Sequence, residues 1–161
     1  ERRKYNNLNM TKSINIIFGT QTGNAEQAAN DISEYVKSNG FQTFVQELDD
    51  VDLNKLKDMN YLMIITSTFG DGEMPGNATI FWSKLTSADN DNLDLKKIRY
   101  SVLALGDRTH ADFCNAGKLL DEKFEKQGAN KILERAECDV EFDEISKEWS
   151  KNFLEKIEQI N

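Results

Sequence analysis

The chain has 161 residues, 39% apolar and 30% charged, which suffices for one hydrophobic core in an ordinary globular protein. Its formal net charge of −8 argues against nucleic acid and anionic membrane surfaces as partners, since both attract positive charge, and favours basic proteins instead. No apolar run is long enough for a membrane span, and the polar start does not resemble a signal peptide. Because the two cysteines form neither a disulfide framework nor a metal motif, we expect a cytoplasmic location.

The first half of the chain alternates strand and helix patterns after a polar tail or linker at residues 1–12, with one domain expected over residues 13–161. Ile14–Phe18 is an apolar run, and residues at helical spacing follow from Ala25 to Val36. Phe41–Leu48 alternates apolar and polar residues, which predicts a strand near a sheet edge. Val51–Lys57 predicts a short helical turn.

The second half continues this alternation with continuous apolar strands that predict burial on both faces. The predicted elements are the strands Tyr61–Thr66, Arg99–Leu105 and one that begins at Lys131–Leu133, and helices at about Asn77–Leu85, Phe113–Gln127 and Ile145–Ile160. Five strands that alternate with helices predict an α/β fold, in which a parallel sheet is covered on both faces through right-handed crossovers.

A loop of small residues, Gly19–Ala25, follows the first predicted strand and reads Gly-Thr-Gln-Thr-Gly-Asn-Ala. It lacks the lysine of a nucleoside-triphosphate loop and the GxGxxG spacing of a dinucleotide loop. Its hydroxyls, backbone N–H groups and the helix start behind it suit a single phosphate monoester. An ordinary strand-to-helix turn capped by Thr22 or Asn24 is the alternative.

Two further loops, Ser67–Gly76 and Gly106–Phe113, follow the two buried strands. Six of the nine glycines lie in the three loops, which meet at one edge of a parallel sheet. The flat side chains of Phe69, His110 and Phe113 predict a slot for a ring, and hence a mononucleotide ligand. Alternatively, Phe113 packs in the core and His110, the only histidine, is a polar loop residue without a partner for a metal.

Cys114 follows the third of these loops, at the predicted start of a helix. A thiol at such a position can have a lowered pKa and be reactive. No base stands beside it in the sequence, so a small buried packing residue is the alternative reading that we favour.

Three motifs in this order resemble those of the flavodoxin-like FMN proteins, and the resemblance extends over residues 13–160. The motifs are Gly19–Ala25, Ser67–Glu73, and Leu103–Asp107 together with Phe113–Lys118. The pattern is closest to the FMN domains of diflavin reductases, of the sulfite reductase flavoprotein and cytochrome P450 reductase kind, and to short stand-alone flavodoxins. The resemblance implies a three-layer sandwich with a five-stranded parallel sheet of order 2-1-3-4-5 and FMN as the cofactor.

The resemblance also implies a set of cofactor-binding residues, and neither catalytic nor metal-binding ones. The FMN phosphate would be held by Thr20, Gln21, Thr22, Gly23, Asn24 and Ala25. The ring and ribityl chain would be framed by Ser67, Thr68, Phe69, Gly70, Leu105, Gly106, Asp107, Arg108, Thr109, His110, Phe113 and Cys114, with Asp139 approaching from the loop before the last helix. Phe69 and His110 stand where the diflavin pattern commonly has tyrosines.

The implied function is the shuttling of single electrons between an NADPH-linked flavin reductase and an acceptor, a haem or other redox protein, since the cofactor carries the chemistry. Gly70 is expected to turn its peptide carbonyl towards the flavin, and nearby acids to lower the potential of the reduced cofactor. Between Glu134 and Glu144, six of eleven residues are acidic, which predicts either a docking surface for basic redox partners or simply a solvated face.

Three alternatives stay open at this point. The chain is either a free carrier or a domain of a longer diflavin oxidoreductase. A flavodoxin-like binding or signalling domain without FMN is a second class, although Gly19-Thr20 and Ser67-Thr68 stand where a receiver domain needs acidic residues. A NADPH-dependent quinone reductase of similar fold is the third.

Overall fold

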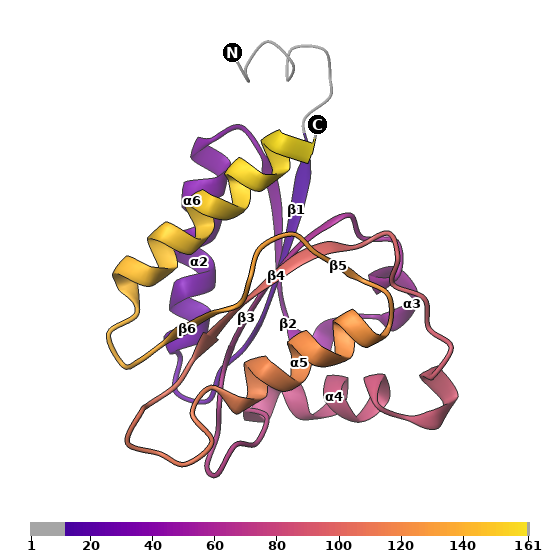
Figure 1. The fold of residues 1–161 in the computed structure, drawn as a ribbon, viewed down its shortest axis with the longest axis vertical. Coiled ribbons are helices and arrows are strands. Elements are labelled where there is room, and N and C mark those ends of the chain that lie inside the picture. The colour runs from indigo at the N-terminus through magenta and orange to yellow at the C-terminus, as the bar shows by residue number, and fades with distance from the viewer. Residues whose placement is uncertain (1–11, 161) are drawn as a thin grey trace.

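The computed structural model describes residues 12–160, and the expected tail at residues 1–12 lies almost wholly outside them. The described chain forms one parallel sheet with helices on both faces (Figure 1). The strand order is β2-β1-β3-β4-β5, and β6 also pairs with β4. The strands are β1 (Ser13–Gly19), β2 (Gln42–Glu47), β3 (Tyr61–Ser67), β4 (Arg99–Leu105), β5 (Asn130–Lys131) and β6 (Ala136–Cys138).

Two cores lie on opposite faces of this sheet. The central strands β3 and β4 are buried along almost their whole length, and successive side chains point to alternate faces, so each strand contributes to both cores. In β3, for example, Met63 and Ile65 belong to one core while Leu62 and Ile64 belong to the other. The first core is covered by α2 (Asn24–Ser38) and α6 (Asp143–Ile160), and the second by α3 (Leu53–Leu56), α4 (Thr79–Leu85) and α5 (Asn115–Lys126).

The predicted α/β fold and the order 2-1-3-4-5 are confirmed, but the predicted last strand is not continuous. It consists of two short strands, since β5 pairs with the beginning of β4 and β6 with its end. The chain leaves the ladder after Ile132, whose N–H still donates to the Tyr100 carbonyl at 3.0 Å. Arg135 then turns back towards α5, where its guanidinium lies 2.6 Å from the Asp121 carboxylate. The helix predicted from Phe113 begins instead at Asn115, because Cys114 has a left-handed backbone (φ 59°).

Asp121 is the centre of a buried polar cluster that fixes this edge of the sheet. Its side chain is 2% exposed, accepts a 2.7 Å hydrogen bond from the Tyr100 hydroxyl and also lies 3.5 Å from the Lys131 ammonium. Burial, followed by the hydrogen bond to Asp121, raises the pKa of Tyr100 far above its ordinary value. The phenol therefore stays protonated and donates, so α5, β4 and the β5–β6 segment are joined through one carboxylate.

Within residues 12–160, no helix combines the length and the apolar character needed to cross a bilayer.

Candidate functional site

A cavity of about 270 Å³ lies at the carboxyl edge of the sheet, next to β1 and β3, where the strand order reverses. The loops that follow β1, β3, β4 and β6 all contribute to its wall. The sequence-predicted residues that line it are Thr22, Asn24, Ser67, Thr68, Gly70, Leu105, Gly106, Asp107, His110, Phe113, Cys114 and Asp139.

Seven other predicted residues are outside this lining: Thr20, Gln21, Gly23, Ala25, Phe69, Arg108 and Thr109. Most of them have structural contacts instead. Ala25 is fully buried in the core under α2, while Thr109 donates from its backbone and its hydroxyl to Asp107. Phe69 is 45% exposed. Wall residues that the sequence motifs did not indicate are Ala111, Asp112, Val140 and Phe142.

The loop after β1 is held by hydrogen bonds that use its own side chains. The Thr20 hydroxyl accepts from the Gly23 N–H (2.8 Å), and Gly23 has the positive φ, 100°, that this turn requires. The Gln21 side-chain oxygen accepts from the Gly76 N–H at 2.8 Å, so this oxygen is engaged with the loop after β3.

Asn77 is a site residue that sequence reasoning missed. Its side-chain oxygen accepts a 2.7 Å hydrogen bond from the Thr20 N–H, and its side-chain nitrogen donates to Glu47 at 3.2 Å. Asn77 lies 57 positions from Thr20 in the chain and at the predicted start of a helix, so no local pattern pointed to this contact.

The start of α2 differs from the side-chain-capped turn that was the alternative reading of this loop. Gly23 is the N-cap, and no side chain of the described residues caps the helix, neither Thr22 nor Asn24. The first-turn N–H groups of an α-helix have no intrahelical acceptor and attract anions. Together with the hydroxyl of Thr22, they give this end of the cavity a set of neutral donors.

The loop after β3 folds back on itself beside the cavity. Phe69 and Glu73 exchange two backbone hydrogen bonds of 2.8 Å, which closes a tight turn with Gly70 at φ 56° and Gly72 at φ 108°. A side chain at Gly70 would be strained by this φ and would place its Cβ 2.9 Å from the Glu73 carboxylate. Asn115 donates to the Gly72 carbonyl at 2.8 Å and thereby anchors the turn to α5.

The loop after β4 is charged and exposed. Asp107 accepts from the Thr109 hydroxyl (2.6 Å) and backbone N–H (2.9 Å), and these hydrogen bonds, with the nearby His110 ring, lower the pKa of Asp107. The His110 Nε2 lies 3.6 Å from the Asp107 carboxylate. Asp112 has φ 56°, which is uncommon for a residue other than glycine.

Cys114 lies in the wall but is no reactive thiol. Its side chain is fully buried and its Sγ donates to the Ala104 carbonyl at 3.3 Å. Burial, reinforced by the negative charge of Glu137, raises the pKa of Cys114 to about 12. The packing role that the sequence favoured is therefore confirmed.

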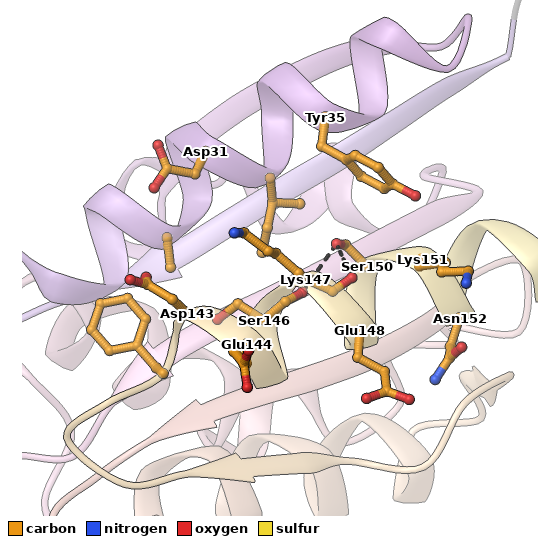
Figure 2. Close-up of a pocket in the computed structure, with 13 residues that line it drawn as sticks. Asp31, Tyr35, Asp143, Glu144, Ser146, Lys147, Glu148, Ser150, Lys151 and Asn152 are labelled. Atoms are coloured by element: carbon orange, nitrogen blue, oxygen red, sulfur yellow. Dashed lines mark hydrogen bonds between the residues drawn. The ribbon is translucent and has the colours of Figure 1, made fainter.

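A separate groove of about 640 Å³ runs between α2 and α6 and shares Phe142 with the cavity. Figure 2 shows the Lys147 side chain extending towards α2, with Asp31 and Tyr35 on the facing helix, while Glu148 and Asn152 point away from α2. Charged side chains of both signs line this groove, and no glycine is among its lining residues in the described chain. It offers neither the phosphate donors nor the close backbone approach found at the sheet edge.

The fold and the cavity define a doubly wound α/β protein whose ligand site lies at the topological switch point of a parallel sheet. The chain belongs to the flavodoxin family, because the Flavodoxin family model matches residues 16–149. The family expected from the three loop motifs is thus confirmed.

Sulfite reductase flavoproteins are one kind of protein that the chain resembles, and solved flavodoxins are the other. The sulfite reductase [NADPH] flavoprotein alpha-component of Bacillus subtilis is 35% identical over 150 residues, which are 93% of this chain and 24% of that protein. The corresponding protein of Buchnera aphidicola subsp. Schizaphis graminum is also 35% identical, over 95% of this chain and 25% of the relative. The chain thus spans about a quarter of the length of these curated relatives.

Solved flavodoxin structures match almost end to end. A flavodoxin from Streptococcus pneumoniae TIGR4 superimposes with a TM-score of 0.79 at 28% identity, over 92% of this chain and 99% of that one. Flavodoxin 2 from Bacillus cereus gives the same TM-score at 25% identity, over 89% of this chain and 99% of the flavodoxin.

Proposed function

We propose that this chain binds FMN at the sheet-edge cavity and transfers single electrons between an NADPH-linked flavin reductase and an acceptor, a haem or other redox protein. The observation that carries the proposal is the convergence of the loops after β1, β3 and β4 on one cavity. Membership of the flavodoxin family supports the same ligand class.

The phosphate end of the cavity fits a monoester dianion. Its donors are the N–H groups at the start of α2 and the Thr22 hydroxyl, while the Thr20 and Gly23 N–H groups hold the loop in place by donating to Asn77 and to the Thr20 hydroxyl. The first acidic residue of α2 is Glu26, which is exposed and lies beyond the loop. A phosphate would replace water at donors that are already oriented, so little reorganisation is needed.

The other end fits a flat ring. Phe113 and His110 contribute planar side chains to the lining, and Leu105 contributes an apolar one. Gly106, which also lines the cavity, lets the backbone approach Cys114 and Phe113 closely. A Cβ at Gly106 would lie 3.0 Å from the Cys114 backbone nitrogen and 3.1 Å from the Phe113 ring. Bound FMN supplies one-electron and two-electron redox chemistry, and the protein supplies its position and surrounding field.

Acidic side chains surround this ring end. Asp107, Asp112 and Asp139 line the cavity, and Glu141, Asp143 and Glu144 follow on the exposed segment beside it. Negative charge opposes the addition of electrons, so these acids would lower the potential of the bound cofactor. They would also steer a basic partner towards the edge where the ring lies, more strongly at low ionic strength.

Part of the acidic run does not contribute to this surface. Glu134 and Glu137 pair with Lys131 (3.8 Å) and Arg135 (3.0 Å), next to β6. The segment Asp139–Glu144 adjoins the cavity, and Val140 and Phe142 between its acids line the wall. Asp139 in this segment pairs with Arg108, so the proposed docking surface consists of Glu141, Asp143 and Glu144, with Asp107 and Asp112.

The relatives named sulfite reductase [NADPH] flavoprotein favour a setting in which this unit works inside, or together with, a larger NADPH-dependent diflavin oxidoreductase. The electron donor would then be an FAD-containing module that accepts hydride from NADPH. Oxidation of NADPH by this chain alone with a quinone would instead identify a quinone reductase.

The test is a titration of the purified chain with FMN and, as a matched control, riboflavin, which lacks the phosphate. We expect FMN to bind with quenched fluorescence and about a hundredfold more tightly than riboflavin, since several charge-assisted hydrogen bonds are involved. Failure to bind FMN would remove the proposal and leave a binding or signalling domain. Equal affinity for the two flavins would mean that the loop after β1 does not hold the phosphate.

A further inference from the structure

Arg108 lies behind the ring end of the cavity and joins two parts of its wall. It precedes His110 in the loop after β4 and is exposed, with 66% of its side chain accessible. It is not among the residues that line the cavity, although Phe113 and Asp139, which it contacts, both are. A direct role in binding the cofactor, which the sequence motifs implied, is therefore not what its position supports.

Three contacts of Arg108 converge on these two wall residues. The guanidinium carbon lies 4.5 Å from the centre of the Phe113 ring, in the geometry of a cation–π interaction. Its Nε lies 3.5 Å from the Asp139 carboxylate. The backbone N–H of Arg108 donates to the other oxygen of Asp139 at 3.2 Å. Asp139 thus accepts a hydrogen bond from the main chain of Arg108 and forms an ion pair with its side chain.

These contacts cross between separate segments. Phe113 ends the loop after β4, whereas Asp139 follows β6 and starts the segment that leads to α6. Near this point the two segments are also joined by the Gly106 N–H, which donates to the Cys138 carbonyl at 2.9 Å, at the base of the cavity. Arg108 makes the corresponding connection at the rim, where the wall is exposed.

Charge at the rim adds a second reason to single out Arg108. The lining holds three carboxylates, Asp107, Asp112 and Asp139, and among the described residues that form it there is neither lysine nor arginine. Asp139 shares this wall with the other two carboxylates, so its negative charge adds to theirs. The guanidinium offsets part of this negative charge while its central carbon lies over the Phe113 ring.

We propose that Arg108 is a positioning residue that holds Phe113 and Asp139 together as one wall and so slows the escape of the flavin ring. The inference rests on the proposed function, since it concerns the same site. Arg108 acts through its two neighbours and not by touching the ligand. Its effect is expected in the dissociation rate, because the wall must open for the ring to leave.

The experiment measures FMN dissociation by stopped-flow fluorescence in the wild type, Arg108→Gln, Asp139→Asn and the double variant. We expect dissociation from Arg108→Gln to be about five- to tenfold faster, since an exposed ion pair and a cation–π contact are lost together. Arg99→Gln is the matched control: Arg99 lies 5.9 Å over the Tyr61 ring, at the opposite end of β4. It should leave the rate unchanged.

Two further comparisons separate positioning from a general effect of charge. Arg108→Lys keeps the charge but not the flat stacking on Phe113, so its rate should lie between those of the wild type and Arg108→Gln. The ratio of the Arg108→Gln rate to the wild-type rate should fall as salt rises, because an exposed pair is screened. A loss of fold would instead appear in circular dichroism.

The outcomes are distinct. A smaller effect of Arg108→Gln in the Asp139→Asn background than in the wild type supports the coupling. The same effect in both backgrounds, full rescue by lysine, or a wild-type rate in Arg108→Gln would overturn the positioning role while leaving FMN binding intact. Absence of FMN binding by the wild type itself would overturn both this inference and the proposed function.

Discussion

The two ends of the cavity are built differently. At the phosphate end, the loop after β1 is fixed by hydrogen bonds of 2.7–2.8 Å that involve Thr20, Gln21 and Asn77. At the ring end, the short hydrogen bonds from Thr109 to Asp107 (2.6 and 2.9 Å) are joined by longer contacts between exposed side chains, at 3.5 Å from Arg108 to Asp139 and 3.6 Å from His110 to Asp107. If FMN binds as proposed, we expect the phosphate end to provide most of the affinity for it. We expect the ring end to set its redox potential, its rate of exchange and the choice of redox partner.

The largest expected effect comes from Asp121, whose buried cluster supports the ring end through β6. Asp121→Ala leaves Arg135 without its buried partner and the Tyr100 hydroxyl without its carboxylate acceptor, so the free energy of unfolding should fall by about 3 kcal/mol. Urea unfolding measures this. The control is Asp58→Ala, which removes an exposed pair with Lys97 (3.2 Å) and should cost less than about 1 kcal/mol. Equal losses in the two variants would contradict the role of the cluster.

The next effect tests the phosphate end. Asn77→Ala removes the acceptor of the Thr20 N–H, which should loosen the loop and weaken FMN binding by about 1–2 kcal/mol, or roughly tenfold, in calorimetry. Asn90→Ala, which removes a side-chain hydrogen bond to the Lys84 carbonyl on α4, is the control and should bind FMN like the wild type. Riboflavin affinity should change less than FMN affinity. An equal loss for both ligands would mean that Asn77 does not act through the phosphate.

Gly70→Val should affect the ring end alone. The backbone at φ 56° and the close Glu73 carboxylate do not accommodate a branched side chain, so the turn must rearrange. We expect the potential of the first electron step to shift by about 60 mV, equivalent to a tenfold change in equilibrium for one electron. Spectroelectrochemical titration measures the shift. An unchanged potential would show that the peptide at Gly70 does not face the flavin.

The smallest effect concerns the charge of Asp107. Hydrogen bonds from Thr109 lower its pKa, so this carboxylate stabilises the folded chain above the ordinary Asp pKa, and the contribution is lost as pH falls through the lowered value. Thr109→Val removes the side-chain donor and should move the pKa of Asp107 back towards the ordinary value. An NMR pH titration of the carboxylate follows this. A pKa that stays as low as in the wild type would assign the lowering to the backbone and His110.

Most of the fold was predictable because its central strands are continuous apolar runs and its three ligand loops follow them directly. β3 and β4 are buried on both faces, and neither a half-buried strand nor a surface helix gives such a pattern. The split of the last strand was not predictable. β5 has only two residues and β6 three, too few for a period to appear, and the segment between them is directed by Asp121, which is distant in the chain.

The site was predictable to the extent that its residues belong to the loops. Glycines and hydroxyls clustered after β1 and β3 indicated the cavity, and Thr22, Ser67, Thr68 and Gly70 among them line it. Asn77 and the contact of Arg108 with Asp139 were missed, because each depends on a pairing across 57 or 31 positions that only the folded sheet creates. Residues such as Asn77 and Arg108, which support the cavity without lining it, are not marked by a sequence motif.

The two buried thiols, Cys114 and Cys138, allow local opening of the protein near the cavity to be measured. Cys114 and Cys138 are fully buried, and burial raises their pKa to about 12 and to about 11. Alkylating reagents react with the thiolate, and burial disfavours this form near neutral pH. Labelling therefore requires a local opening that exposes the thiol to solvent. The rate of alkylation therefore measures how often the structure opens beneath the loop after β4, and no added probe is needed.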